Sequence, residues 1–298
     1  MANITANGIQ IEYENFGNRS NSALILINGL GSQMISWDIP LCEKLANAGH
    51  YIIKFDNRDV GLSTKTEEAG VPDIMEALGK LMEGKSIDAS YTLDDMADDT
   101  VGLMDALNIE KAHICGTSMG AAICQTVGIK HPSRVLSLTT IFGTTGNPEL
   151  PQAKPEVLQA IMTPPVEGRD AFVEQKVNGL KIIKGSKFPF DEEWHQNLAT
   201  SEYDRCYYPE GAARQFLGML AHGNRKPALT KVTAPTLVIH GKEDPLIPVE
   251  GGIDIADAIP NAELMLIDGF GHELPRLGGA WEQITDKIIE FTANVDSQ

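Results

Sequence analysis

The chain has 298 residues, of which 42% are hydrophobic and 22% are charged, a composition typical of a soluble globular enzyme with one substantial core. Its 41 acidic and 24 basic residues give a formal net charge of −17, and no run of Lys or Arg offsets it, so nucleic acid and anionic membrane surfaces are poor partners. Its apolar runs have the length of strands, so we expect no membrane span. The N-terminus lacks the basic and apolar regions of a secretory signal, which predicts a cytoplasmic protein.

Most of the chain alternates between predicted strands and predicted helices. Residues 8–16 alternate apolar and polar side chains and predict an edge strand, whereas the continuous apolar run of residues 23–27 predicts a buried strand. Thr92 and two acidic residues of the following turn predict the start of a helix. Further buried strands are predicted at residues 51–55, 112–115, 135–141, 236–240 and 263–267. This alternation predicts an α/β protein with a mostly parallel central sheet and helices on both faces.

The alternation stops between residues 144 and 231. Several prolines there precede helix-like stretches around residues 169–177 and 210–221, and no buried strand is evident. We interpret this segment as an inserted helical cap. The predicted organisation is therefore an N-terminal core of residues 1–143, a cap of residues 144–231 and a C-terminal core of residues 232–298.

A candidate nucleophile lies in the sequence Gly116-Thr-Ser-Met-Gly120, directly after the predicted strand at residues 112–115. This GxSxG pattern is typical of a serine on a sharp turn from a strand into a helix. Glycines suit the two outer positions because a Cβ there would collide with neighbouring backbone. We therefore expect the hydroxyl of Ser118 to be exposed at the end of a strand.

A serine hydroxyl needs a general base and a group that orients the base. His272 lies in a glycine-rich loop after the last predicted strand, and Asp244 follows the strand before it. All three groups then lie at the carboxyl edge of the sheet. Glu243 and Asp268 remain alternatives for the acid, because spacing alone does not exclude them.

The other histidines are weaker candidates for the base. His50, His113 and His131 occupy positions that favour structural roles, and His240 ends a strand close to the expected site, where we expect a packing neighbour. His195 and His222 lie in the predicted cap and could contact the substrate.

Acyl transfer also requires hydrogen-bond donors for the oxyanion. The turn Asn28-Gly-Leu-Gly31 follows a buried strand, and its glycines would let backbone amides approach the substrate. We assign the oxyanion hole to the amides of Leu30 and Met119, with a simple tight turn as the alternative interpretation.

Taken together, these motifs resemble those of the α/β-hydrolase superfamily, and most of all the aclacinomycin methylesterase group. The segment from Asp56 to Ser63 is similar to the family's DxRxxGxS turn, and Gly271-His272 is followed by Leu274-Pro275. One departure is Asn28, where many relatives have His before the glycine of the oxyanion turn. The resemblance implies the α/β-hydrolase fold, the triad Ser118, Asp244 and His272, and a carboxylic ester as the substrate, such as a methyl ester of a hydrophobic acid.

Single residues distinguish this chain from proteins of the same fold that have other activities. Haloalkane dehalogenases and epoxide hydrolases use an aspartate where this chain has Ser118, and proline iminopeptidases usually carry Trp where it has Met119. Carbon–carbon hydrolases and cofactor-free perhydrolases share the triad and remain open. A non-enzymatic small-molecule receptor is disfavoured, because such proteins often lose a triad member.

The sequence predicts no metal and no cofactor. Its four cysteines are scattered, with neither CxxC nor zinc-finger spacing, and we expect reduced buried thiols. Apolar side chains of the cap are candidate walls of a substrate pocket, unless they pack the cap onto the body. They are Phe172, Trp194, Tyr207, Tyr208 and Phe216.

Overall fold

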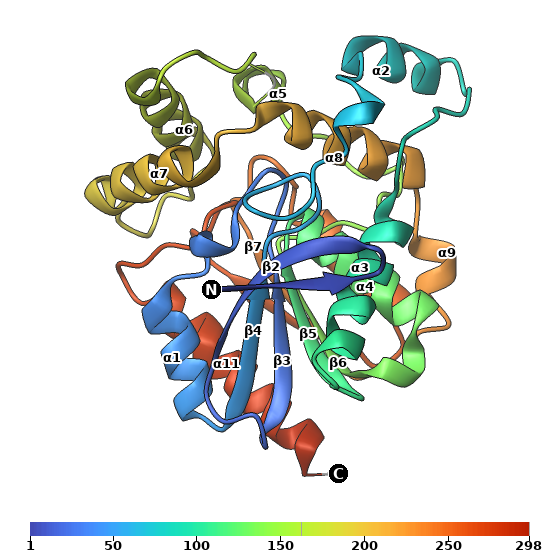
Figure 1. Ribbon diagram of the computed structural model, residues 1–298, viewed down its shortest axis with the longest axis vertical. Coiled ribbons are helices and arrows are strands. Elements are labelled where there is room, and N and C mark those ends of the chain that lie inside the picture. Colours follow the sequence, from blue (N-terminus) through green and yellow to red (C-terminus); the bar gives the residue numbers. More distant parts are fainter. Residues whose placement is uncertain (162, 298) are drawn as a thin grey trace.

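The computed structural model describes residues 1–161 and 163–297. In these residues a central sheet lies between two layers of helices, and further helices lie above one edge of the sheet (Figure 1). The strands are ordered β1-β2-β4-β3-β5-β6-β7-β8. Their bounds are β1 (Ala2–Ala6), β2 (Ile9–Phe16), β3 (Ser22–Ile27), β4 (His50–Phe55), β5 (Ala112–Thr117), β6 (Val135–Ile141), β7 (Thr236–Gly241) and β8 (Glu263–Ile267).

The sheet is parallel from β4 to β8, and only β1 and β2 are antiparallel to their neighbours. The predicted α/β class is therefore confirmed. The prediction that residues 8–16 form an edge strand is wrong, because β1, which the sequence analysis did not anticipate, pairs with β2 from outside. The alternating pattern of β2 reflects its position near the end of the sheet, where helices cover its two faces unequally.

The continuous apolar run of β3 arises because both of its faces are buried. Ile25 and Ile27 pack with one set of helices, whereas Leu24 and Leu26 pack with the set on the opposite face. Successive side chains of a strand point to opposite faces, so a strand covered on both sides is apolar at every position. The first layer contains α3 (Leu93–Ala106), α4 (Met119–Lys130) and α10 (Glu250–Ala258), and the second contains α1 (Ile39–Asn47) and α11 (Ala280–Asp296).

Helix α3 begins where its sequence predicts. The Thr92 side chain accepts a hydrogen bond from the backbone amide of Asp94, and the Asp95 side chain accepts one from the amide of Thr92. This reciprocal arrangement satisfies amides that the helix itself leaves without partners.

Among the described residues between β6 and β7 there are five helices, and most of them form the upper layer in Figure 1. They are α5 (Pro155–Ile161), α6 (Arg169–Ile183), α7 (Glu192–Cys206), α8 (Pro209–His222) and α9 (Lys226–Leu229). Two of these, α6 and α8, extend the helices expected at residues 169–177 and 210–221, whereas α5 and α7 had no recognised signal. A separate helix from the first half of the chain, α2 (Ile74–Met82), joins this layer (Figure 1).

The chain leaves and re-enters the core at neighbouring points. The backbone amide of Arg225 donates to the carbonyl of Thr145 at 2.8 Å, and the buried Arg225 guanidinium donates to the carbonyl of Thr144 and to the side chain of Gln125. Burial lowers the pKa of Arg225 to about 10. The two ends of the helical segment are therefore held together by one residue, Arg225, through its backbone amide and its side chain.

The four cysteines are free thiols. Burial raises the pKa of Cys42 and of Cys115 to about 12, so both are poor nucleophiles. Short 3₁₀ turns complete the described structure, at Met34–Ser36, Glu67–Ala69 and Pro132–Arg134. Among the described helices, none has the length and apolar character needed to span a bilayer.

Candidate active site

Ser118 lies on a sharp turn between β5 and α4. Its φ of 54° and ψ of −116° are sterically unfavourable for a residue with a Cβ. A Cβ on Gly116 would lie 2.1 Å from the carbonyl oxygen of Gly120, and a Cβ on Gly120 would lie 2.2 Å from the carbonyl oxygen of Ile27. The two glycines are therefore required by backbone packing, and the turn they permit strains the residue between them.

The structure brings together the three side chains that the sequence predicts as a catalytic group. Ser118 Oγ lies 2.9 Å from Nε2 of His272, and Nδ1 of the same ring lies 2.7 Å from Oδ2 of Asp244. His272 and Asp244 are buried. The second carboxylate oxygen of Asp244 accepts hydrogen bonds from the backbone amides of Leu246 and Ile247, which hold the acid in place.

The two alternative acids lie elsewhere. Glu243 accepts a hydrogen bond from the backbone amide of Ser186, and Asp268 pairs with Lys242 at 2.8 Å. The hydrogen bond from Ser186 lowers the pKa of Glu243, and the bond from Lys242 lowers that of Asp268. Both carboxylates thus have partners other than His272.

His240 is fully buried beside the acid. Its Nε2 donates to the carbonyl of Ile247 at 2.9 Å and lies 3.6 Å from Oδ2 of Asp244. Burial lowers the pKa of His240 and keeps the ring neutral near pH 7. It therefore packs under the site without adding a charge.

The remaining histidines lie away from Ser118. His195 is buried in the upper layer, stacked on Phe190 with ring centroids 4.4 Å apart, and lies 3.5 Å from Glu273. His222 faces Asp94 at 4.0 Å. The other three, His50, His113 and His131, belong to the body of the molecule.

The turn after β3 lies directly against the nucleophile. A Cβ on Gly29 would lie 3.2 Å from the Cβ of Ser118, which leaves room only for glycine close to the hydroxyl. Met119 begins α4, and the first amides of a helix have no partner within the helix. The amides of Leu30 and Met119 thus belong to the two backbone segments that adjoin Ser118.

Side chains that the sequence analysis did not recognise hold the turn after β3. The amide group of Asn28 donates to the carbonyl of Gln33, and that of Asn57 donates to the carbonyl of Asn28. From the upper layer, the side chain of Gln215 accepts from the amide of Gly31 at 2.9 Å. Gln33 in turn donates to carbonyls of α7, at Glu202 and Cys206. Apart from Asn28 and Gln33, these partners are distant in sequence, so no local pattern indicates them.

The segment from Asp56 to Ser63 joins the core to the upper helices. Asp56 is fully buried, accepts from the amides of Met34 and Leu62, and lies 2.7 Å from Arg205 of α7. Gly61 has a φ of 53°, and a Cβ there would overlap the carboxylate of Asp56. The segment from Asp56 to Ser63 therefore supports the turn after β3, chiefly through the hydrogen bonds of the Asp56 carboxylate.

A second acid of this segment forms a closely matched ion pair with the upper layer. Both carboxylate oxygens of Asp59 accept hydrogen bonds from Arg214 of α8, at 2.9 and 3.0 Å, and the hydroxyl of Tyr91 donates to the same carboxylate. Burial opposes ionisation of Asp59, but the hydrogen bonds from Arg214, the Thr66 amide and Tyr91 outweigh it and lower its pKa. Asp59 therefore stays charged although it is buried.

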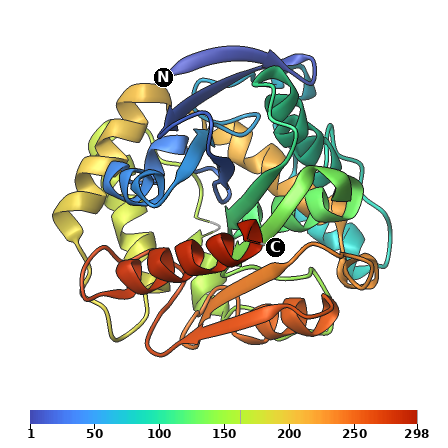
Figure 2. The ribbon, with the colours of Figure 1, turned by 90° about the horizontal axis from the view of Figure 1, so that it is seen from below.

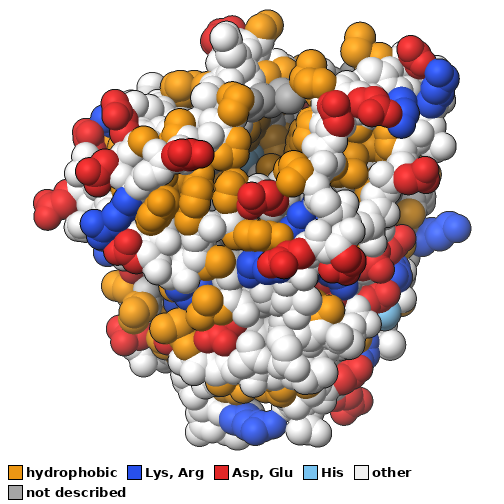
Figure 3. Space-filling view, turned by 45° about the horizontal axis from the view of Figure 1, so that its top comes forward, with side chains coloured by type: hydrophobic (Ala, Val, Ile, Leu, Met, Phe, Trp, Pro, Cys, Tyr) orange, Lys and Arg blue, Asp and Glu red, His pale blue; other side chains and the backbone are white. Residues whose placement is uncertain are grey.

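Apolar side chains gather on the upper layer (Figure 3). Those most exposed on α2, α5 and α6 are Met75, Leu81, Met82, Leu158, Ile161 and Ile182. Of the candidate pocket walls, Phe172 and Tyr207 pack against each other with centroids 5.2 Å apart, and Trp194 packs against His195 at 4.8 Å. The hydroxyl of Tyr208 accepts from Arg214. These contacts all lie within the upper layer.

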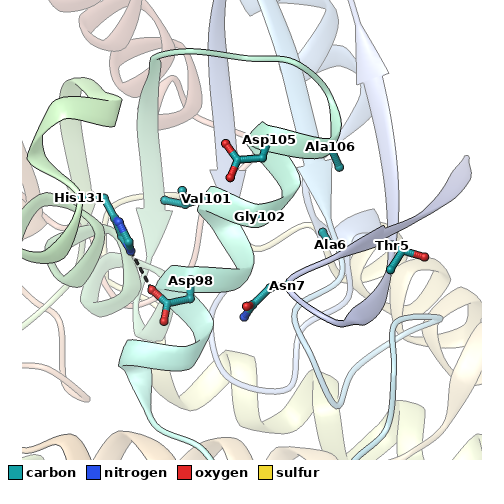
Figure 4. Close-up of a pocket in the computed structure, with 9 residues that line it drawn as sticks. All are labelled: Thr5, Ala6, Asn7, Asp98, Val101, Gly102, Asp105, Ala106 and His131. Carbon is teal, nitrogen blue, oxygen red and sulfur yellow. Dashed lines mark hydrogen bonds and ion pairs between the residues drawn. The ribbon is translucent and has the colours of Figure 1, made fainter.

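The body of the molecule has a depression between β1 and α3 (Figure 4). Among the residues that line it, Nε2 of His131 lies 2.7 Å from Oδ1 of Asp98. This depression contains no hydroxyl next to its histidine, so it does not provide the chemistry found at Ser118.

The comparisons with known proteins agree with this geometry. The model of the alpha/beta hydrolase fold family matches residues 22–275. A rhodomycin D methylesterase of Streptomyces sp. (strain C5) is 26% identical, over 91% of this chain and 92% of its own length. A 2-hydroxymuconate semialdehyde hydrolase of Pseudomonas sp. (strain CF600) is 30% identical, over 78% of this chain and 79% of its own.

A solved structure shows the same fold over the whole chain. It is a thermophilic esterase from Thermogutta terrifontis, with a TM-score of 0.69 and 21% identity, covering 99% of this chain and 98% of the esterase. At this identity the likeness concerns the fold alone. With the parallel sheet, the strained serine turn and a family match over most of its length, the chain belongs to the α/β-hydrolase fold family.

Proposed function

We propose that the protein is a serine hydrolase that cleaves carboxylic esters through an acyl-enzyme intermediate. The observation that carries this proposal is the hydrogen-bonded series Ser118, His272 and Asp244, with distances of 2.9 and 2.7 Å, at a strained turn. Nucleophile, base and orienting acid are within hydrogen-bond reach of one another, as this chemistry requires.

In the proposed first step, Ser118 Oγ attacks the ester carbonyl while Nε2 of His272 accepts the hydroxyl proton. The carbonyl oxygen becomes an oxyanion, which accepts hydrogen bonds from the amides of Leu30 and Met119. The tetrahedral intermediate expels the alcohol, which receives the proton from His272. Asp244 keeps Nδ1 protonated and stabilises the charged ring.

In the second step, water attacks the acyl-enzyme. His272 accepts a proton from the water and returns one to Ser118 as the acid leaves.

We further propose that residues 144–231 act as a cap that selects the substrate. Support comes from their position above one edge of the sheet and from the hydrogen bond of Gln215 to the turn after β3 (Figure 1). The exposed apolar side chains of this layer favour a hydrophobic acyl group. Exchange of residues 144–231 with those of a relative should change the substrate profile, and an unchanged profile would contradict the cap proposal.

The substrate we favour is an ester with a small alcohol leaving group, such as a methyl ester of a hydrophobic acid. The methylesterase among the relatives, aligned over most of both chains, supports this choice. Carbon–carbon hydrolysis is the second candidate, because a semialdehyde hydrolase is also a relative, at 30% identity. Cofactor-free perhydrolysis uses the same triad and is a third.

Two experiments test the proposal. An organophosphonate ester should add once to the protein, and peptide mapping should locate it on Ser118; a label on any other residue would contradict the assignment. Comparison of kcat/KM for methyl esters, long-chain acyl esters, amides and ring-fission diketones should then favour an ester. Preference for a diketone over every ester would instead support the carbon–carbon hydrolase.

A further inference from the structure

Two buried histidines and a carboxylate meet on the body, at the end of the sheet opposite to Ser118. They are His50 at the start of β4, His113 in β5 and Asp296 at the end of α11. One ligand atom from each lies within 4.8 Å of the other two. In the described part of the chain, these residues are the only three His, Cys, Asp or Glu side chains grouped closely enough to share an ion.

The fold explains how residues so distant in sequence meet. His50 lies opposite Ser22 of β3, and His113 lies opposite Leu24 on the other side of the same strand. Their rings are 5.6 Å apart at an angle of 81°. Helix α11 crosses this part of the sheet and ends beside it (Figure 2), which places Asp296 Oδ1 3.1 Å from Nε2 of His113.

We propose that His50, His113 and Asp296 form a binding site for a divalent transition-metal ion such as Zn²⁺, which fastens the C-terminal helix to the sheet. Two imidazoles and one carboxylate are ligands that Zn²⁺ accepts, with water in the fourth position. Two such ligand atoms on one tetrahedral ion lie about 3.4 Å apart. The distance of 3.1 Å between His113 and Asp296 is therefore already suitable, and the ligand atom of His50, within 4.8 Å of both, needs only a small shift to reach the same ion.

The surroundings of the rings favour coordination. Nδ1 of His113 lies 2.8 Å from the hydroxyl of Ser137, a contact that orients the ring with Nε2 toward Asp296. Metal-binding histidines usually have such an outer hydrogen bond on their second nitrogen. The outer partner of His113 is therefore already in place.

The hydrogen bonding of the His50 ring supports the proposal independently. Nε2 of this ring pairs with Thr292 Oγ1 at 2.9 Å, whereas Nδ1 is buried and has no hydrogen-bond partner among the described residues. A buried polar atom without a partner is costly. A flip of the ring exchanges the two nitrogens, so His50 can present either atom to an ion.

Access and charge also agree with the proposal. The two imidazoles are nearly inaccessible, but 32% of the Asp296 side chain is exposed, so an ion can enter from the solvent along the carboxylate. A net charge of −17 attracts cations to the protein in general. This attraction acts on the whole surface, so the experiment compares variants of the three residues with a control elsewhere on the body.

The test is calorimetric titration of Zn²⁺ into the full chain after treatment with EDTA, in a buffer that does not bind zinc. Wild-type protein should bind one ion and unfold at a higher temperature with zinc than without it. Asp296→Asn preserves size at an accessible position, and His113→Asn retains a donor near the Ser137 hydroxyl. Each should weaken zinc binding at least about tenfold, since even loss of an outer partner commonly has that effect.

His131→Gln is the matched control, because His131 also pairs with a carboxylate on the body, that of Asp98 (Figure 4). It should leave zinc affinity unchanged. Equal binding by wild type and Asp296→Asn would overturn the proposal, as would no binding by wild type or loss of binding in His131→Gln. Ester hydrolysis, measured in parallel, should be unaffected by one equivalent of zinc; inhibition that persists in Asp296→Asn would place the ion at His272 instead.

Discussion

The turn that carries Ser118 and the helical layer above it adjoin each other but are held by different means. The turn is constrained by backbone contacts: Gly116 and Gly120 lie where any Cβ would overlap a carbonyl. The helical layer is constrained by side chains, above all the pairs of Asp59 with Arg214 and of Asp56 with Arg205. The backbone contacts are rigid and join Gly116 to its own turn and Gly120 to Ile27 of β3, whereas the ion pairs join residues about 150 positions apart.

The two regions should therefore tolerate different changes. Removal of the Ser118 hydroxyl should abolish chemistry and leave the fold intact. Removal of a buried ion-pair partner should weaken the fold and leave the triad residues unchanged. The following predictions test that separation, beginning with the largest effect.

Ser118→Ala should lower kcat/KM for p-nitrophenyl acetate by roughly 10⁴- to 10⁶-fold, because both the nucleophile and the acyl-enzyme are lost. The melting temperature should change little, since the methyl group fits where the serine Cβ already lies. Ser20→Ala, at an exposed surface serine, is the control and should retain full activity. Substantial residual activity in Ser118→Ala would show that another residue attacks the ester.

Arg214→Met should lower the free energy of unfolding by about 3–5 kcal/mol, because it leaves the Asp59 carboxylate buried without its cation. Denaturant unfolding measures this loss. The double variant Asp59→Asn with Arg214→Met should recover part of it, since the unpaired charge is removed. A double variant as unstable as the sum of the single variants would contradict the proposed coupling.

The same pair predicts a dependence on pH. Hydrogen bonds from Arg214, the Thr66 amide and Tyr91 outweigh burial and lower the pKa of Asp59 below its ordinary value of about 4. Its stabilising contribution is therefore present above that value and is lost as the pH falls through the lower pKa of the folded state. The stability difference between wild type and Asp59→Asn should shrink in acid. A difference that grows in acid would reverse the assignment.

Gly120→Ala should destabilise the protein by about 1–3 kcal/mol, because its Cβ would lie 2.2 Å from the carbonyl oxygen of Ile27. It should also lower kcat, since the strand and the turn must move apart at the nucleophile. Gly79→Ala in α2 is the control: a Cβ there meets no atom within 4 Å, and Ala favours a helix by up to about 1 kcal/mol. Thermal unfolding and ester hydrolysis of the two variants provide the comparison.

Arg169→Ala should have the smallest effect. Its guanidinium pairs with Asp204 between α6 and α7, but both side chains are about half exposed. Water screens such a pair, so the stability should change by less than about 0.5 kcal/mol. A loss as large as that of Arg214→Met would show that exposed pairs, as well as buried ones, hold the helical layer.

Much of the core could be predicted from the sequence because its signals are local. Buried parallel strands appear as short apolar runs, and seven of the eight strands occur where such runs or alternation indicate them. The exception, β1, is a segment of five residues that forms a strand by pairing with the outer edge of β2. The GxSxG pattern likewise lies within five residues, although Gly120 also packs against the carbonyl of Ile27 in β3.

The upper helices were less predictable, because their stability depends on partners elsewhere. Helix α7 buries only three of its side chains and is held by the pair of Arg205 with Asp56, whereas α2 is amphipathic but reaches the layer from a different part of the chain. Likewise, Gln215 and Asn57 support the turn after β3 through contacts that exist only after folding.

The sequence by itself determined the α/β class, the serine turn and the residues that could form a triad, because steric limits and strand patterns operate between close neighbours. The sequence favours Asp244 as the partner of His272 without excluding Glu243 or Asp268, and the folded contacts separate the three: Asp244 lies beside His272, whereas the other two carboxylates have other partners. Only the tertiary structure decided the grouping of His50, His113 and Asp296. Each looks structural alone, and the crossing of α11 beneath the sheet brings them together.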